Sequence, residues 1–265
     1  MIRGSNGQMR LSAAARQTTL DLTAGLRLLA QGGQNDLAAG FFSARHPEEE
    51  GLFFASSHGV FWHEVTQDDF GLYSCETRER VDNGNSRAPN FASLANSSAI
   101  YKAFPGVNAI VHAHPESVMA ICAMEGARGE ILPISEPSFM FYERVRKVPC
   151  NFFFTDDYLE TVASAFSDDH FCVLMKNHSY LMVGSTIPEC YMRSYMLEQS
   201  ARVQLRALSS SGGELPVIPS HDECLFHRKS YDGYDGCPPY DGSLEWPSLI
   251  RQLDSTSEGW RATME

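Results

Sequence analysis

The chain has no long apolar run and no excess of basic residues. No stretch of about 18 consecutive apolar residues occurs in its 265 positions, so we expect no membrane-spanning helix and no membrane partner. The 33 acidic side chains outnumber the 21 basic ones and give a formal net charge of −12. Nucleic acids and anionic lipid surfaces are bound through clustered lysine and arginine, so neither is expected as the main partner.

Regular cysteine spacing is also missing. The seven cysteines are odd in number, irregularly placed and mostly embedded in apolar stretches. This pattern favours reduced thiols in the core over a disulfide framework, and it predicts a reducing, cytoplasmic location. Residues 1–8 are polar and glycine-rich without the apolar stretch of a signal peptide. We therefore expect residues 1–10 to be a disordered tail or cloning remnant outside the fold.

The sequence contains no P-loop, no dinucleotide-binding fingerprint and no internal repeat. Its length and its 43% apolar content suit one sizeable core, so we expect a single folded unit. Its main part spans residues 11–208. Residues 209–242 are rich in serine, glycine, proline and aspartate and show no period, which indicates a wrapping segment or an arm to a neighbouring subunit. That segment and the helix after it make up residues 209–265.

Apolar periodicity predicts the main elements. Helical spacing is expected over residues 11–31, 92–104, 117–124, 156–166, 186–208 and 244–253. Strand-like runs occupy residues 37–44, 52–55, 70–75, 109–114, 171–176 and 180–183. Strands and helices alternate without the strict rhythm of a doubly wound fold. This arrangement favours a mixed sheet covered by helices.

Two histidines close one of these apolar runs. His112 and His114 stand one residue apart in Ala-Ile-Val-His-Ala-His-Pro. Residues i and i+2 of a strand project to the same face, so both imidazoles point to one place and can share a metal ion. Burying two imidazoles side by side is costly unless something binds them, which makes the pair a stronger signal than a single core histidine.

His178 is the candidate for a third ligand. It ends the apolar run Phe-Cys-Val-Leu-Met-Lys-Asn-His, and three neutral imidazoles make a site with open positions for water or substrate. The sequence pattern does not show whether the two strand ends meet.

Several segments resemble the class II aldolase and adducin family. Residues 99–115 and Lys-Asn-His-Ser-Tyr-Leu-Met-Val-Gly at 176–184 are similar to the family's histidine-bearing segments. Ala-Gly-Phe-Phe-Ser-Ala-Arg at 39–45 resembles its early Gly-Asn-X-Ser-X-Arg strand, and residues 57–70 resemble the turn and helix that follow. Residues 198–205 and 245–254 are most similar to the adducin-like branch.

The resemblance implies a fold, an assembly and a cofactor. The fold is an α/β/α sandwich around a largely antiparallel mixed sheet, with residues 11–208 as the catalytic domain. The assembly is a homo-oligomer, usually a tetramer, with active sites between subunits. The cofactor is one divalent metal ion on His112, His114 and His178, with Zn²⁺ expected first and Mn²⁺ or Fe²⁺ as other options.

The chain departs from the family's sugar-phosphate aldolases at two positions. Ser93, in Pro-Asn-Phe-Ala-Ser, stands about where their catalytic glutamate falls, and Phe41 replaces the asparagine of their phosphate cradle. We therefore expect a small non-phosphorylated substrate with an aromatic or apolar group and a carbonyl or carboxylate, contacted by Phe41 and Ser93. Neighbouring aromatic residues suit such a substrate, although each can equally belong to the core: Phe42, Phe61 and Trp62.

The general acid and base must then lie elsewhere. In the family, the stretch equivalent to residues 136–144 runs past the metal site, which suggests Tyr142 as proton donor, Glu143 as base and Arg144 as a clamp for a substrate carboxylate. A solvated Glu-Arg pair behind a core aromatic is the alternative interpretation. His58 and His63 are further candidates for substrate contacts, because the turn that they occupy replaces residues that approach the substrate in relatives.

Three functions remain open from the sequence. The first is a metal-dependent lyase for aldol cleavage or decarboxylation. The second is a non-heme Fe²⁺ oxygenase on the same scaffold, which the missing glutamate and an apolar site would suit. The third is a non-catalytic, adducin-like interaction domain, which would have no need for three imidazoles.

Overall fold

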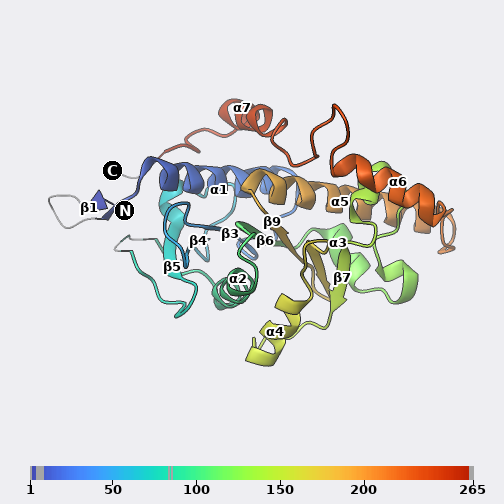
Figure 1. Ribbon diagram of the computed structural model, residues 1–265, viewed down its shortest axis with the longest axis horizontal. Coiled ribbons are helices and arrows are strands. Elements are labelled where there is room, and N and C mark those ends of the chain that lie inside the picture. Colours follow the sequence, from blue (N-terminus) through green and yellow to red (C-terminus); the bar gives the residue numbers. More distant parts are fainter. Residues whose placement is uncertain (1, 4–8, 83, 85, 263–265) are drawn as a thin grey trace.

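A seven-stranded mixed sheet forms the centre of the fold (Figure 1). The computed structural model describes residues 2–3, 9–82, 84 and 86–262. The sheet has the order β5-β4-β3-β6-β9-β8-β7 and is antiparallel except between β7 and β8. Its strands are β3 (Phe41–Arg45), β4 (Leu52–Ser56), β5 (Phe70–Ser74), β6 (Ala109–Ala113), β7 (Val145–Val148), β8 (Cys172–Met175) and β9 (Tyr180–Gly184).

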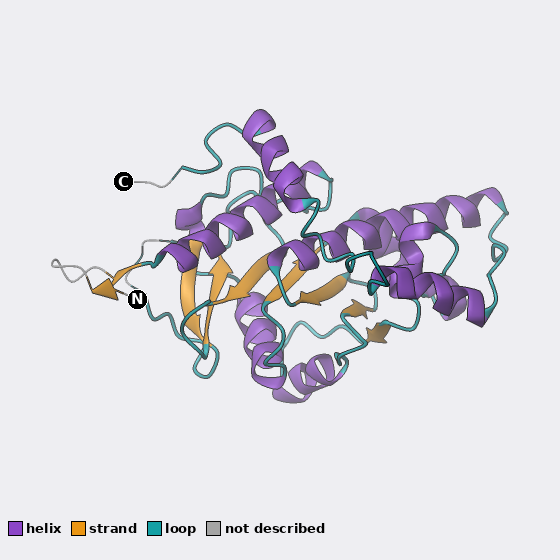
Figure 2. Ribbon diagram, turned by 45° about the horizontal axis from the view of Figure 1, so that its top comes forward, coloured by secondary structure: helices purple, strands orange, loops and turns teal. Residues whose placement is uncertain are grey.

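Helices cover both faces of the sheet, as Figure 2 shows. On one side lie α1 (Ala13–Gln31) and α5 (Ile187–Ser210), with α7 (Trp246–Thr256) over α1; on the other lie α2 (Phe91–Ala103) and α4 (Asp156–Ser164). The remaining helices are α3 (Glu116–Cys122) and α6 (His221–Tyr231), with short 3-10 helices at Gln67–Asp69, Gly126–Gly129 and Glu136–Phe141. The expected α/β/α sandwich around a largely antiparallel sheet is therefore confirmed.

Local sequence explains how the covering helices begin and which side they bury. The Ser12 hydroxyl accepts from the Ala15 amide and caps α1, whose Leu22, Leu26 and Leu29 are fully buried at helical spacing. Helix α5 begins with Ile187-Pro188 behind the cap Thr186, since proline fits the first turn of a helix.

Three elements differ from those that the sequence predicted. Helix α6 lies in the segment expected to be irregular. It was not predicted because it buries only Cys224 and Tyr231 and so has no clear apolar stripe. The strand expected over 37–44 is β3 at Phe41–Arg45, since Leu37 has a φ of 50° in a turn closed by Asp36 and Ala39. Strand β7 was not expected.

The N-terminal tail is described in part. The backbones of Ile2–Arg3 (β1) and Met9–Arg10 (β2) pair antiparallel. The rest of the tail expected over residues 1–10 lies outside the described residues.

The described residues form neither a helix that could cross a membrane nor a disulfide. None of the helices described combines the length and apolarity needed to cross a bilayer. All seven cysteines are described and none is in a disulfide; five are buried, Cys150 is half-buried and Cys237 is exposed. This agrees with the expected reduced thiols.

Pairing of the central strands positions the histidines. In the β6–β9 ladder, His112 is opposite Leu181 and Ala113 is opposite Tyr180. The turn between β8 and β9, which carries His178, therefore closes beside the end of β6. On the other side of β6, Phe41 pairs with His112, so β3 begins at the same place.

Gly40 permits this close approach, and its replacement tests the packing. A Cβ at Gly40 would lie 2.5 Å from the His112 carbonyl oxygen and 2.8 Å from Trp62 Cζ2, and its φ is 87°. We expect Gly40→Ala to lower the free energy of unfolding by about 2–4 kcal/mol. Gly33→Ala, with a φ of 70° and nothing within 4 Å, should cost only about 1–2 kcal/mol, and Gly106→Ala should be neutral. Thermal unfolding of the three variants measures this, and equal effects of Gly40→Ala and Gly33→Ala would contradict the close contact.

Candidate metal centre

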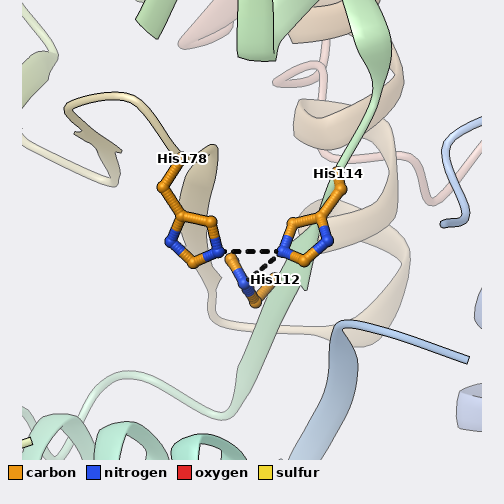
Figure 3. A group of neighbouring side chains, drawn as sticks. All are labelled: His112, His114 and His178. Atoms are coloured by element: carbon orange, nitrogen blue, oxygen red, sulfur yellow. Dashed lines mark hydrogen bonds between the residues drawn. The ribbon is translucent and has the colours of Figure 1, made fainter. Parts of the chain in front are cut away.

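The three histidines converge at one end of the sheet (Figure 3). His112 lies in β6, His114 directly follows β6, and His178 lies in the β8–β9 turn. Each offers one ligand nitrogen, and these nitrogens all lie within 4.8 Å of one another. The Nε2 atom of His114 is 2.8 Å from Nε2 of His112 and 3.1 Å from Nε2 of His178. The expected meeting of the two strand ends is confirmed.

Each imidazole has a partner for its other nitrogen. His112 Nδ1 donates to the Tyr180 carbonyl oxygen at 2.7 Å, and His114 Nδ1 lies 3.3 Å from a carboxylate oxygen of Asp36. His178 Nδ1 lies 3.3 Å from the thiol sulfur of Cys150. Such outer partners fix the ring orientation and the tautomer of metal-binding histidines. All three Nε2 atoms are thus left facing inward.

Electrostatics keep the three imidazoles neutral. Burial, together with the neighbouring His114 and His178, holds the pKa of His112 well below its usual value. Burial also lowers the pKa of His178 to about 4 and lowers that of His114, where Asp36 acts in the opposite direction. Neutral imidazoles present unshared electron pairs, which is the form that binds metal.

The chemistry of this donor set fits a divalent cation. A carbonyl oxygen only accepts and a carboxylate accepts, so His112 and His114 carry their protons on Nδ1. Their Nε2 electron pairs then face each other at 2.8 Å, which is unfavourable unless a cation lies between them. Nitrogen ligands of tetrahedral Zn²⁺ stand about 3.3 Å apart, so a small outward shift of the rings accommodates such an ion.

Phe41 lies beside the trio, and Ser93 lies buried in the first turn of α2. Phe41 is buried, and its ring centroid lies 5.7 Å from that of His112. The Ser97 and Tyr101 hydroxyls of α2 lie within hydrogen-bond distance of Ser43 in β3, and Ser93 lies one turn before Ser97 in the same helix. The Ser93 hydroxyl is buried and has no hydrogen-bond partner in the described structure.

Tyr142, Glu143 and Arg144 lie against α6. The Tyr142 hydroxyl is 2.9 Å from Nδ1 of His221, and a Glu143 oxygen is 3.6 Å from the same nitrogen. Arg144 donates to both carboxylate oxygens of Asp232, at 2.7 and 2.6 Å. Within the described residues, the hydrogen bonds, ion pairs and ring contacts found for Tyr142, Glu143 and Arg144 do not include the histidine trio, so their assigned roles stay predictions.

The remaining candidates lie near the turn after β4. His58 is exposed, and its amide donates to the Ala88 carbonyl just before α2. Phe61 is partly exposed and stacks on His63, whereas Trp62 is buried. The role of His58 in substrate binding is not tested by these contacts.

Sequence reasoning missed three residues that touch the trio. Asp36 follows the glycine stop of α1, and its proximity to His114 depends on the turn that Leu37 makes. Cys150 and Phe152 precede α4, and the Phe152 ring centroid lies 5.0 Å from that of His178. The run of three phenylalanines at 152–154 was a signal, because consecutive aromatic residues between a strand and a helix are unusual for a solvated loop.

Fold and site together define a class of protein: an α/β/α sandwich with a three-histidine centre suited to a divalent metal at one end of its sheet. The sequence profile of the class II aldolase and adducin N-terminal domain matches residues 21–205. The chain therefore belongs to the class II aldolase and adducin family. Aldolases of this family use a divalent metal ion.

Relatives span both branches of the family. A candidate class 2 aldolase of Pseudomonas aeruginosa is 27% identical over 266 residues, covering 96% of this chain and 95% of that protein. Human beta-adducin is 25% identical over 246 residues, covering 90% of this chain but 31% of the adducin. The resemblance to the family seen in the sequence is thus confirmed.

Solved structures share the fold. An aldolase II superfamily protein from Pseudomonas syringae has a TM-score of 0.84 at 24% identity, covering 96% of this chain and 98% of that one. An L-fuculose 1-phosphate aldolase from Glaciozyma antarctica has a TM-score of 0.78 at 23% identity, covering 96% and 97%. At these identities the likeness concerns the fold alone.

Replacing any one of the three histidines should abolish metal binding. We expect His112→Ala, His114→Ala and His178→Ala to fall to background metal content, because two imidazoles are too few to hold the ion tightly. Circular dichroism should show a fold like that of the wild type. Elemental analysis of protein purified without chelator measures the effect, with His63→Ala as the control. Full metal content in any of the three variants would refute the site.

Asp36 gives a test of the outer partners. Asp36→Asn keeps the shape of the side chain but removes the carboxylate that accepts from His114, so metal affinity should fall about 10–100-fold. Competition with a chromogenic chelator measures the affinity. Glu76→Gln removes an exposed carboxylate that pairs with Lys102 and should change nothing. An unchanged affinity in Asp36→Asn would mean that this contact does not support the ligand.

Proposed function

We propose that this protein is a metal-dependent carbon–carbon lyase, of the aldolase or decarboxylase type, for a small non-phosphorylated compound with a carbonyl or carboxylate and an aromatic or apolar group. The observation that carries the proposal is the convergence of three histidine nitrogens within 4.8 Å of one another in a member of this family. His112, His114 and His178 would hold the ion, with Zn²⁺ expected first and Mn²⁺ or Fe²⁺ as alternatives. A bound ion of this kind acts as a Lewis acid toward substrate oxygen atoms.

Residues around the trio support a substrate without phosphate. The Phe41 ring packs beside His112. By the resemblance to the family, Phe41 stands where the sugar-phosphate aldolases have the asparagine of their phosphate cradle. Ser93 brings an uncharged hydroxyl in place of a glutamate, and this hydroxyl has no partner among the described residues. A buried hydroxyl of this kind gains a hydrogen bond when a polar group of a ligand reaches it.

Tyr142 is the proposed proton donor. Burial and the nearby Glu143 carboxylate raise the pKa of Tyr142, so its phenol stays protonated at neutral pH. His221 lies between the Tyr142 hydroxyl and Glu143 and can return a proton to the phenol after transfer, with Glu143 acting as the base of this array. These residues contact α6, and none of the contacts found for them within the described residues reaches the trio of their own chain. In the proposed homotetramer they would serve the trio of a neighbouring copy.

Arg144 is proposed mainly as a positioning residue. Its guanidinium is paired with Asp232, so a role as clamp for a substrate carboxylate requires that a carboxylate compete with Asp232 for it. The more direct role is to hold α6 against the segment that carries Tyr142. Arg228 of α6 supports this arrangement, since it donates to the Tyr142 carbonyl oxygen at 3.2 Å.

Similarity to beta-adducin supports a second candidate function, a non-catalytic interaction domain. The burial of three converging imidazoles favours the lyase, because a surface used only for protein contacts gains nothing from desolvating them.

Metal removal and the variant Tyr142→Phe distinguish the lyase from the other candidate functions. Turnover of non-phosphorylated aldol adducts and 2-oxo acids should disappear with a chelator and return with Zn²⁺ or Mn²⁺. We expect Tyr142→Phe to lower kcat by about 10²–10⁴ with unchanged metal content, because only proton transfer is lost. Tyr234→Phe, at an exposed tyrosine, is the control. Iron with oxygen consumption would instead indicate the oxygenase, and a protein that holds no metal would indicate the interaction domain.

A further inference from the structure

Residues 150–154, Cys-Asn-Phe-Phe-Phe, form a loop between β7 and α4 that we call the phenylalanine loop. Two of its residues touch one imidazole of the trio. The Cys150 sulfur lies 3.3 Å from Nδ1 of His178, and the Phe152 ring stands edge-on to the His178 ring at 5.0 Å between centroids. The loop is therefore part of the immediate surroundings of the metal centre.

The phenylalanine loop has a defined conformation. The Asn151 side-chain oxygen accepts from the Phe153 amide at 2.9 Å, which closes a local turn. Phe154 has a φ of 48°, a conformation that a bulky residue adopts only where packing imposes it. Its ring lies between those of Phe91 and Tyr158, at 5.9 and 6.1 Å. The loop is thus clamped between α2 and α4.

The clamped loop presents its other two rings outward. Phe152 is 67% exposed and Phe153 is 87% exposed. Phe91, in the first turn of α2, is also more than half exposed. Exposed aromatic side chains grouped beside a ligand-binding centre indicate an apolar surface for binding.

We infer that the phenylalanine loop is the specificity wall of the site: Phe152 and Phe153 contact the aromatic or branched apolar group of a substrate whose oxygen atoms face the trio. This inference rests on the proposed function. Phe152 shares a ring contact with His178, which places its aromatic surface beside the trio and within the proposed reach of a ligand bound there. Because the loop is already held by Phe154, little conformational freedom is lost when the ligand binds.

A matched pair of probes tests the inference. Phenylpyruvate and pyruvate share the same 2-oxo acid group and differ in the phenyl ring. Their binding is followed by the visible absorption of the Co²⁺-substituted full-length protein. We expect phenylpyruvate to bind at least about tenfold more tightly than pyruvate to the wild type. Phe152→Ala combined with Phe153→Ala should bring the ratio of the two dissociation constants close to one without changing pyruvate affinity.

Two further variants control the experiment. Phe152→Leu keeps apolar volume and should retain part of the preference. Phe226→Ala removes a ring that is 73% exposed on α6 and should leave the ratio unchanged. Metal content of every variant should equal that of the wild type.

The outcomes separate this inference from the proposed function. If neither 2-oxo acid perturbs the Co²⁺ spectrum of the wild type, binding of carbonyl compounds at the trio is wrong. If both bind equally to the wild type, or the double variant keeps the wild-type ratio, only the specificity wall is overturned. If the double variant dissociates from an oligomer into monomers, the loop covers a neighbouring copy, which also overturns the wall.

Discussion

Antiparallel pairing of β6 with β9 is the constraint on which the site depends. The register places Ala113 opposite Tyr180, so the Tyr180 carbonyl can accept from His112 and the preceding turn can present His178. A shift of one residue would turn every side chain of β6 to the opposite face of the sheet. Both faces of β6 are buried, so such a shift would place side chains of the wrong size in each packed face, which close packing disfavours. The core of the sheet therefore determines the geometry of the imidazoles.

The environment of the trio stores electrostatic repulsion that a cation relieves. The three neutral imidazoles are held in place by a carbonyl, a carboxylate and a thiol on their outer side, and the Nε2 electron pairs of His112 and His114 face each other. Burial disfavours protonation as a way to relieve the repulsion, since a charged imidazole would lose its solvation. The same features that make the site costly to fold make it ready to bind metal.

Different parts of this molecule form the scaffold and are assigned the substrate specificity. The sandwich is shared with a family that includes aldolases and adducins, so the fold defines a scaffold rather than one reaction. The segments to which we assign specificity and proton transfer lie outside the sheet: the first turn of α2, the phenylalanine loop, and the Tyr142 segment against α6. Loops and helix ends on a rigid sheet can change chemistry without disturbing the core.

Apolar periodicity in the sequence by itself determined most strands and helices and paired His112 with His114, because alternation along one strand requires no knowledge of distant residues. It did not reveal α6, whose polar sequence carries no apolar stripe, although Ser220 and Glu223 form a capping box there. Only the tertiary structure decided that His178 joins the pair, that Asp36 and Cys150 support the ligands, and that Tyr142 and Arg144 contact α6. These contacts join residues far apart in the chain, and the folded sheet and its packed helices bring them together.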